Sequence, residues 1–338
     1  MEWSLSLIYF CCVFLATLGL TGLLLRFFRM HAILDYPNKR SSHSIPTPKG
    51  AGIAVIGCVS LSWIIVTWTT ALAGDTLVVV FAALVLALLS WFDDIRGLSP
   101  LWRFIAQIFA VTFVLIITWP WTKSEFILFG ETWSVIWVYF AVVIAWVWFI
   151  NLFNFMDGID GISGVETTSI SIGVVLICLV TGLEPILGQF GIILSASALG
   201  FLVWNWHPAK IFLGDVGSVP LGFLLGWLLL QLALSGQWSA ALILPLYYIG
   251  DATITLVWRV LDGKKVWHAH NEHFYQQAIL RGFSHSKVVC YIFLTNISLV
   301  ILAVTAALGW RWLSLISAGI IVICLLFVFC AKRSTEKF

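Results

Sequence analysis

Charged residues are scarce in this sequence. Asp, Glu, Lys and Arg make up 10% of the 338 residues, whereas a soluble domain carries about 25%. Hydrophobic residues reach 61%, which is more apolar surface than one core could remove from water. The composition therefore excludes a soluble globular domain and indicates a membrane protein that contacts the lipid bilayer. The net charge of +2 indicates no strongly basic surface, and we expect no nucleic-acid partner.

Cysteine motifs and a secretory leader are also missing. The seven cysteines lie inside apolar runs without metal-ligand spacing, so we interpret them as small core residues. The first apolar stretch follows Met1-Glu2 and is itself followed by Arg26 and Arg29. This is the reverse of the charge order in a signal peptide, and it predicts a retained first span with the N-terminus outside.

Long apolar runs recur along the whole chain. Each is close to the ~20 residues that a helix needs to cross a bilayer. The sequence predicts an all-α polytopic integral membrane protein of a single domain, residues 1–338, with about eleven transmembrane helices. The expected spans are 4–25, 51–71, 76–92, 101–119, 133–152, 165–182, 186–206, 217–235, 239–258, 288–308 and 312–330.

The distribution of basic residues predicts the orientation. Of the 18 Lys and Arg residues, only Lys123 and Arg311 fall in loops on the same side as the N-terminus. Because positively charged loops stay in the cytoplasm, the C-terminus and the other basic loops are expected to be cytoplasmic, as in a bacterial inner-membrane protein.

Five aspartates follow spans on this predicted cytoplasmic side. They are Asp93, Asp94, Asp157, Asp160 and Asp215. Ionisable groups near the membrane are costly and usually functional, and carboxylates gathered together repel one another unless a cation compensates. The pattern predicts a bound divalent metal, although Asp93-Asp94 alone could equally be an ordinary helix end.

Two segments carry most of this signal. In the first, Asn151, Asn154, Asp157 and Asp160 recur every three residues, which predicts one polar stripe along a helix with oxygen ligands suited to Mg²⁺ or Mn²⁺. The three glycines of this segment allow a break in the helix, and a helix terminus with glycine caps is the alternative. In the second, Asp215 lies between glycines immediately before an expected helix, and helix N-termini attract phosphate. A metal–diphosphate unit is therefore expected there.

Two further loops could bind phosphate. The loop 36–52 contains Lys49 among Pro, Ser, Thr and Gly residues, and its cations serve equally well for membrane topology. The late loop contains His268, His270 and His273. Their spacing fits no zinc motif, so phosphate binding or proton transfer is expected instead.

Taken together, these motifs resemble the polyprenyl-phosphate N-acetylhexosamine-1-phosphate transferases of glycosyltransferase family 4, which include the phospho-MurNAc-pentapeptide transferases of cell-wall synthesis. The shared pattern is Asp-Asp, Asn-x-x-Asn-x-x-Asp-Gly-x-Asp-Gly, Gly-Asp-x-Gly-Ser and a late His-rich loop, and it runs from about Asp35 to His285. The resemblance implies an active site on the cytoplasmic face.

The resemblance also implies roles for individual residues. It implies Mg²⁺ or Mn²⁺ on Asp215 and Asn154, and it makes Asp93 the candidate base for the lipid phosphate with Asp94 beside it. Catalytic roles are expected for Asp93, Asp94, Asp215 and His273. Substrate-binding roles are expected for Lys49, Asn151, Asp157, Asp160, Asn205, Phe212, His268 and His270, with Asn205 and Phe212 at the uracil base.

The substrates follow from the same resemblance. A UDP-N-acetylhexosamine would donate its sugar-1-phosphate to undecaprenyl phosphate and release UMP, and a homodimer is allowed. The late loop continues from His273 as Phe-Tyr-Gln, where relatives often have His-x-His-His. This departure favours the branch that initiates O-antigen, with GlcNAc or a 6-deoxy sugar such as FucNAc. The alternatives are a phospho-MurNAc-pentapeptide transferase and a membrane transporter or flippase.

Overall fold

The computed structural model describes residues 3–37, 45–69, 73–119, 125–128, 131–183, 185–265 and 270–331. Within them, ten helices are long and apolar enough to cross a membrane, which confirms the all-α polytopic fold. The helices are α1 (Trp3–Met30), α2 (Gly52–Thr69), α3 (Ala73–Arg96), α4 (Pro100–Thr118), α5 (Val135–Met156), α6 (Ile162–Thr181), α7 (Pro185–Asn205), α8 (Asp215–Leu232), α9 (Trp238–Ile243), α10 (Leu246–Leu261), α11 (Phe274–Leu280), α12 (His285–Ala307) and α13 (Arg311–Cys330), with a π-helical turn at Ala233–Gln237.

Helices α6, α7 and α8 form the centre of the bundle. Their residues are largely buried, whereas α1, α4 and α13 expose many apolar side chains, as helices that face lipid must. Small residues allow close packing at the centre. A Cβ atom at Gly226 of α8 would lie 2.4 Å from the Trp146 ring of α5, so this glycine sets the distance between the two helices.

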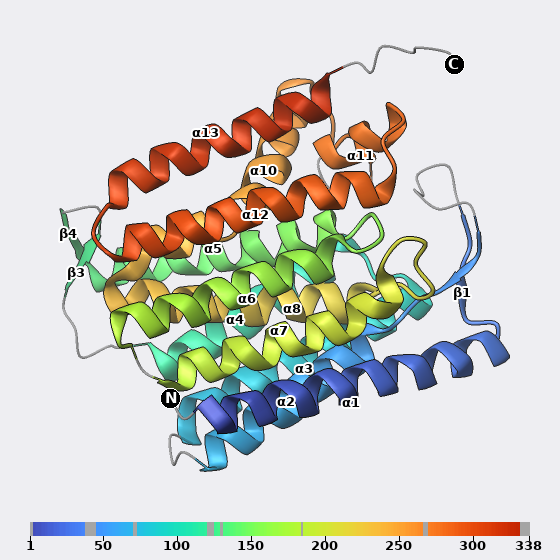
Figure 1. The fold of residues 1–338 in the computed structure, drawn as a ribbon, viewed down its shortest axis with the longest axis horizontal. Coiled ribbons are helices and arrows are strands. Elements are labelled where there is room, and N and C mark those ends of the chain that lie inside the picture. The colour runs from blue at the N-terminus through green and yellow to red at the C-terminus, as the bar shows by residue number, and fades with distance from the viewer. Residues whose placement is uncertain are drawn as a thin grey trace.

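All the acidic motifs reach the same end of the bundle, at the right in Figure 1. Helix α3 ends there, α5 ends there, and α8 begins there. Helix α1 begins at the opposite end of the bundle from the one at which α13 finishes. The sequence-based expectation that the aspartates gather at one face is thus confirmed.

The expected span 239–258 is not one helix. Helix α9 ends at Ile243 and α10 begins at Leu246. Pro245 separates them, because proline has no N–H to donate and its ring clashes with the preceding turn. The structure also contains two short antiparallel pairs that the sequence analysis missed: β1 (Leu34–Asp35) with β2 (Thr47–Pro48), and β3 (Glu125–Leu128) with β4 (Glu131–Ser134).

Candidate active site

The loop containing Lys49 is fastened to the segment that precedes α8. Phe212 donates its N–H to Pro48 O at 2.8 Å and accepts from Gly50 N at 3.0 Å. Beyond these bonds the two backbones nearly touch, because a Cβ atom on Gly52 would lie 2.2 Å from the Cα of Gly217. Only glycine permits this close approach of the two backbones. The approach places Lys49 beside the start of α8.

Two cations link three of the predicted aspartates. The Nζ of Lys49 lies 2.6 Å from Asp94 Oδ1 and 3.8 Å from Asp215 Oδ1. One guanidinium nitrogen of Arg103 lies 3.0 Å from Asp93 Oδ2 and 3.5 Å from Asp215 Oδ2. We call these five residues the acidic cluster. Burial alone would lower the pKa of Lys49, but the charges of Asp215 and Asp94 outweigh burial and raise it.

The backbone also holds two of these carboxylates. Asp94 Oδ2 accepts from Val216 N, in the first turn of α8, at 3.2 Å, where the helix dipole favours an anion. Asp93 Oδ1 accepts from Leu98 N at 2.5 Å. This bond shapes the turn between α3 and α4, and it presents the other oxygen of Asp93 to Arg103.

Arg103 was missed by the sequence analysis, which counted it only as a topological charge. A signal was available. Arg103 and Gln107 stand four residues apart on one face of the mainly apolar α4, and Gln107 Oε1 accepts from Asn151 Nδ2 at 2.6 Å. A polar pair at helical spacing inside a membrane span points to a polar partner nearby.

The prediction of one polar stripe was wrong for its second half. Asn151 and Asn154 lie in α5, but the helix ends at Met156, and Asp157 and Asp160 occupy the following loop. The loop turns into α6 at Gly161, which has a φ of 83° that other residues rarely adopt.

Asn154 and Asp157 nevertheless lie beside the acidic cluster. Asn154 Nδ2 donates to Ser218 Oγ of α8 at 2.8 Å, so its nitrogen rather than its oxygen makes this bond. Asp157 accepts from Ser163 Oγ at 2.6 Å. Burial is the main cause that raises the pKa of Asp157 to about 7, and the charge of Asp215 adds to it. Asp157 can therefore ionise near neutrality.

Asp160 belongs to a second group. Its Oδ2 lies 2.6 Å from His207 Nδ1 and 3.4 Å from His285 Nδ1, and it accepts from Ala209 N at 3.1 Å. Burial alone would raise the pKa of Asp160, but these bonds lower it. The three side chains could approach one cation, yet 2.6 Å is a hydrogen-bond distance. Two ligands of a tetrahedral zinc, at bond lengths of about 2.0–2.2 Å, would stand about 3.3 Å apart.

Asn205 and Phe212 hold the loops together. Asn205 Oδ1 accepts from Gly161 N at 2.9 Å, and its Nδ2 donates to Ile211 O at 3.0 Å. The amide therefore ties the loop after α5 to the loop before α8. Phe212 is half-buried beside Lys49, to which it is bridged through the backbone.

The late loop forms a third group. His273 is buried, and its Nδ1 lies 3.3 Å from Asp251 Oδ1. His270 stacks on His273 with ring centroids 4.8 Å apart. Burial and the charge of His273 lower the pKa of His270 to about 4. His268, together with 38–44 of the early loop, lies outside the described residues.

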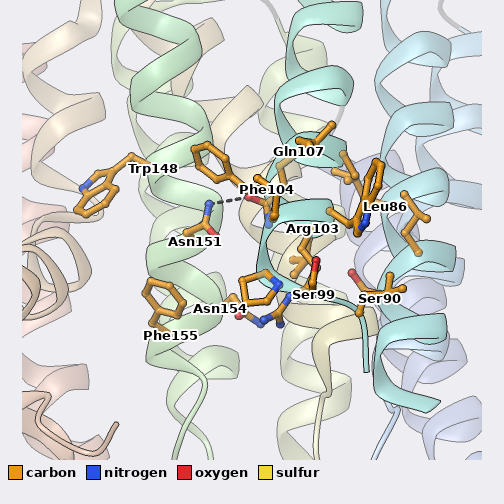
Figure 2. A pocket seen from close by; sticks show the side chains of 18 of the residues that line it. Leu86, Ser90, Ser99, Arg103, Phe104, Gln107, Trp148, Asn151, Asn154 and Phe155 are labelled. Carbon is orange, nitrogen blue, oxygen red and sulfur yellow. Dashed lines mark hydrogen bonds between the residues drawn. The ribbon is translucent and has the colours of Figure 1, made fainter. Parts of the chain in front are cut away.

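A long apolar cavity leads to the acidic cluster. Its volume is about 1420 Å³, and α3, α4, α5, α8 and α10 contribute to its walls. Figure 2 shows Ser99, Arg103 and Asn154 near one another on this wall, with Gln107 and Asn151 joined by a hydrogen bond farther along. Several of the lining side chains are large, apolar and exposed: Leu101, Trp102, Phe109, Val260 and Leu261.

The sequence is similar to that of known proteins. The family model described as glycosyl transferase family 4 matches residues 76–233. A Bacillus subtilis protein named as a probable undecaprenyl-phosphate N-acetylglucosaminyl 1-phosphate transferase is 27% identical over 301 residues, covering 86% of this chain and 82% of that protein.

The chain is also similar to two proteins named for other activities. A decaprenyl-phosphate N-acetylglucosaminephosphotransferase of Mycolicibacterium smegmatis is 26% identical over 321 residues, which covers 83% of this chain and 79% of that protein. A phospho-N-acetylmuramoyl-pentapeptide-transferase of Streptococcus thermophilus is 32% identical over 193 residues, covering 54% of this chain and 56% of the relative.

Proposed function

The chain belongs to glycosyl transferase family 4, and from that premise we propose that it transfers a sugar-1-phosphate from a UDP-sugar to a polyprenyl phosphate. The observation that carries the proposal is the connection between the apolar cavity and the acidic cluster. Arg103 belongs to both, because it lines the cavity and contacts Asp93 and Asp215. A ligand with a long apolar chain and an anionic head matches this arrangement.

The acceptor occupies the cavity in this proposal. Its polyprenyl chain lies against the apolar walls, where burial of hydrocarbon is favourable, and its phosphate reaches Arg103. The donor diphosphate lies between Lys49 and the N-terminus of α8, which supplies backbone N–H groups and a favourable dipole. The two substrates thus meet at Asp215.

The reaction exchanges one phosphoanhydride for another. A phosphate oxygen of the acceptor attacks the β-phosphorus of the UDP-sugar, the bond from the β-phosphorus to the bridging oxygen breaks, and UMP leaves with that oxygen. Lys49 and Arg103 neutralise the phosphate charges and hold the groups in line, which is the principal form of catalysis in phosphoryl transfer. Because a phosphate monoester has a second pKa near 6, Asp93 is not required to remove a proton.

Mg²⁺ or Mn²⁺ fits the oxygen atoms available. The Asp215 carboxylate is only 25% exposed and has its cations at 3.5 and 3.8 Å, and Asn154 makes its hydrogen bond through nitrogen. Carboxylate and amide oxygens are the ligands that these ions prefer. When bound, the ion would neutralise charge on the diphosphate.

The finer assignments are part of the same proposal. The donor carries an N-acetylhexosamine, either GlcNAc or a 6-deoxy sugar such as FucNAc, and the acceptor is undecaprenyl phosphate. The product then initiates O-antigen or a similar surface polysaccharide. The site faces the cytoplasm of a bacterial inner membrane, because UDP-sugars are cytoplasmic and the basic loops lie at this end.

The test is UMP release by the detergent-purified protein. The protein is incubated with undecaprenyl phosphate and a panel of UDP-N-acetylhexosamines, including UDP-MurNAc-pentapeptide, with Mg²⁺ or with EDTA. We expect lipid-dependent UMP that disappears in EDTA. UMP from the pentapeptide donor alone would place the chain with the cell-wall enzymes, and folded protein that releases no UMP from any donor would contradict the proposal.

A further inference from the structure

Asp251 is a fully buried carboxylate outside the acidic cluster. Three donors converge on it: Phe274 N at 3.0 Å, Tyr275 N at 3.1 Å and the hydroxyl of Tyr247 at 3.2 Å. The two backbone N–H groups belong to the first turn of α11. They would otherwise lack an intrahelical acceptor, so a side chain of α10 caps the N-terminus of α11.

Helix α10 has two different faces. Asp251, Thr255 and Arg259 recur every four residues along one helical face, and all three are buried. Arg259 donates to Glu272 Oε1 at 2.5 Å and to Lys265 O at 3.0 Å. The polar stripe therefore holds the late loop. Other residues of the same helix line the apolar cavity: Leu256, Val257, Val260 and Leu261.

Tyr275 connects α11 to the end of α5 and the loop that follows it. Its hydroxyl donates to Phe155 O at 3.0 Å, and a Cβ atom on Gly158 would lie 2.1 Å from the same hydroxyl. Tyr275 thus packs on the backbone at both ends of a four-residue segment that contains Asp157 and adjoins Asn154. Because Asp251 accepts from the N–H of Tyr275, it fixes the backbone position from which this side chain extends.

We propose that Asp251 is a positioning residue for the transfer reaction. It touches no reacting atom. By capping α11 it places His273 and Tyr275, and through Tyr275 it holds the end of α5 so that Asn154 and Asp157 face the acidic cluster. This inference rests on the proposed function. The claim that Asp251 caps α11 can nevertheless be tested without measuring activity.

The first test replaces the carboxylate with an amide of the same shape in the full-length protein. In Asp251→Asn, one acceptor oxygen becomes an NH₂ group that faces N–H or O–H donors, so the cap keeps one acceptor and is weakened. We expect kcat to fall about 10- to 100-fold, while KM for undecaprenyl phosphate changes less than about 3-fold because the apolar face of α10 is unchanged.

Hydrogen–deuterium exchange gives a readout that does not depend on catalysis. Amides of residues 270–281 should exchange at least about 10-fold faster in Asp251→Asn, because the cap of α11 is weakened. Asp262→Asn is the matched control. It makes the same change on an exposed carboxylate at the end of the same helix, and it should leave both exchange and kcat at the wild-type values.

Tyr275→Phe tests the contact between Tyr275 and the end of α5. It also provides a second test if Asp251→Asn does not fold. It removes only the hydroxyl, so kcat should fall about 10-fold while exchange of α11 stays unchanged. Because Asp251 acts through Tyr275, the double variant should lose less than the product of the two single losses. Multiplicative losses, or a folded Asp251→Asn with wild-type kcat, would overturn the proposal. Inactive wild-type protein would instead refute the proposed function, and the exchange experiment would still decide whether Asp251 caps α11.

Discussion

Removing Arg103 tests whether the apolar cavity and the acidic cluster form one active site. Its guanidinium contacts Asp93 at 3.0 Å and Asp215 at 3.5 Å. A hydrogen bond between charged groups contributes about 1.5–3 kcal/mol. The longer contact is weak, and the side chain is 38% exposed, so solvent screening reduces the total. In the proposed reaction the guanidinium also binds the lipid phosphate. For that charged hydrogen bond we take about 2 kcal/mol, which corresponds to about 30-fold in kcat/KM.

The assay is the initial rate of UMP release at varied undecaprenyl phosphate. Arg103→Ala should lower kcat/KM for the lipid about 30-fold, and Arg103→Lys should recover part of it, since the charge remains without the planar fork. Arg96→Ala is the matched control, because Arg96 is exposed at the end of α3. Equal effects of Arg103→Ala and Arg96→Ala would refute the reasoning.

Three further predictions follow from the site and its packing. Asp215→Ala should abolish UMP release, because Asp215 is reached by both Lys49 and Arg103 and is the proposed metal ligand, whereas Asp93→Asn should leave measurable activity; equal and complete loss in both would contradict this ranking. The pKa of Asp157 is raised from 3.8 to about 7, so the folded protein holds an extra proton between these values and loses stability as the pH rises through 7. In EDTA, the melting temperature should therefore fall more between pH 5 and 8 in the wild type than in Asp157→Asn, and parallel curves would argue against a buried acid. Gly52→Ala should lower the melting temperature and the activity together, because its Cβ would meet the backbone of Gly217 at 2.2 Å, whereas Gly57→Ala on the same helix meets nothing within 4 Å and should be neutral; similar melting temperatures would refute this packing.

The bundle was predictable because lipid imposes a simple rule. A span must be helical and about 20 residues long, so apolar runs locate the helices to within a few residues. The rule fails at Pro245, where a sufficiently apolar run is divided into α9 and α10. Hydropathy measures transfer into lipid and does not register a missing N–H group.

The acidic residues were predictable as a set, but their local geometry was not. Asp93, Asp94 and Asp215 do meet at one end of the bundle. The spacing of three residues from Asn151 suggested one helical stripe, whereas the chain leaves the helix at Met156 and turns at Gly161. Periodicity cannot reveal where a helix ends when its end lies within the motif.

The contacts between elements far apart in the chain could not be predicted from the sequence. Arg103 serves the site because α4 packs between α3 and α5 and its guanidinium reaches Asp215 at the start of α8. Asp251 caps a helix that begins more than twenty residues later in the chain. Each residue has an ordinary interpretation taken alone, as a topological charge or a deeper acid. Only the packing of the helices shows which partner each side chain meets.

The most direct test of the central claim follows the β-phosphorus. A UDP-N-acetylhexosamine carrying ³²P in the β-phosphate and ¹⁴C in the sugar is incubated with the purified protein, undecaprenyl phosphate and Mg²⁺. We expect both labels to enter the lipid fraction in a ratio of about one to one, with unlabelled UMP released. If the sugar label enters the lipid while the β-phosphate remains in UDP, the protein transfers the sugar alone, and the account is wrong.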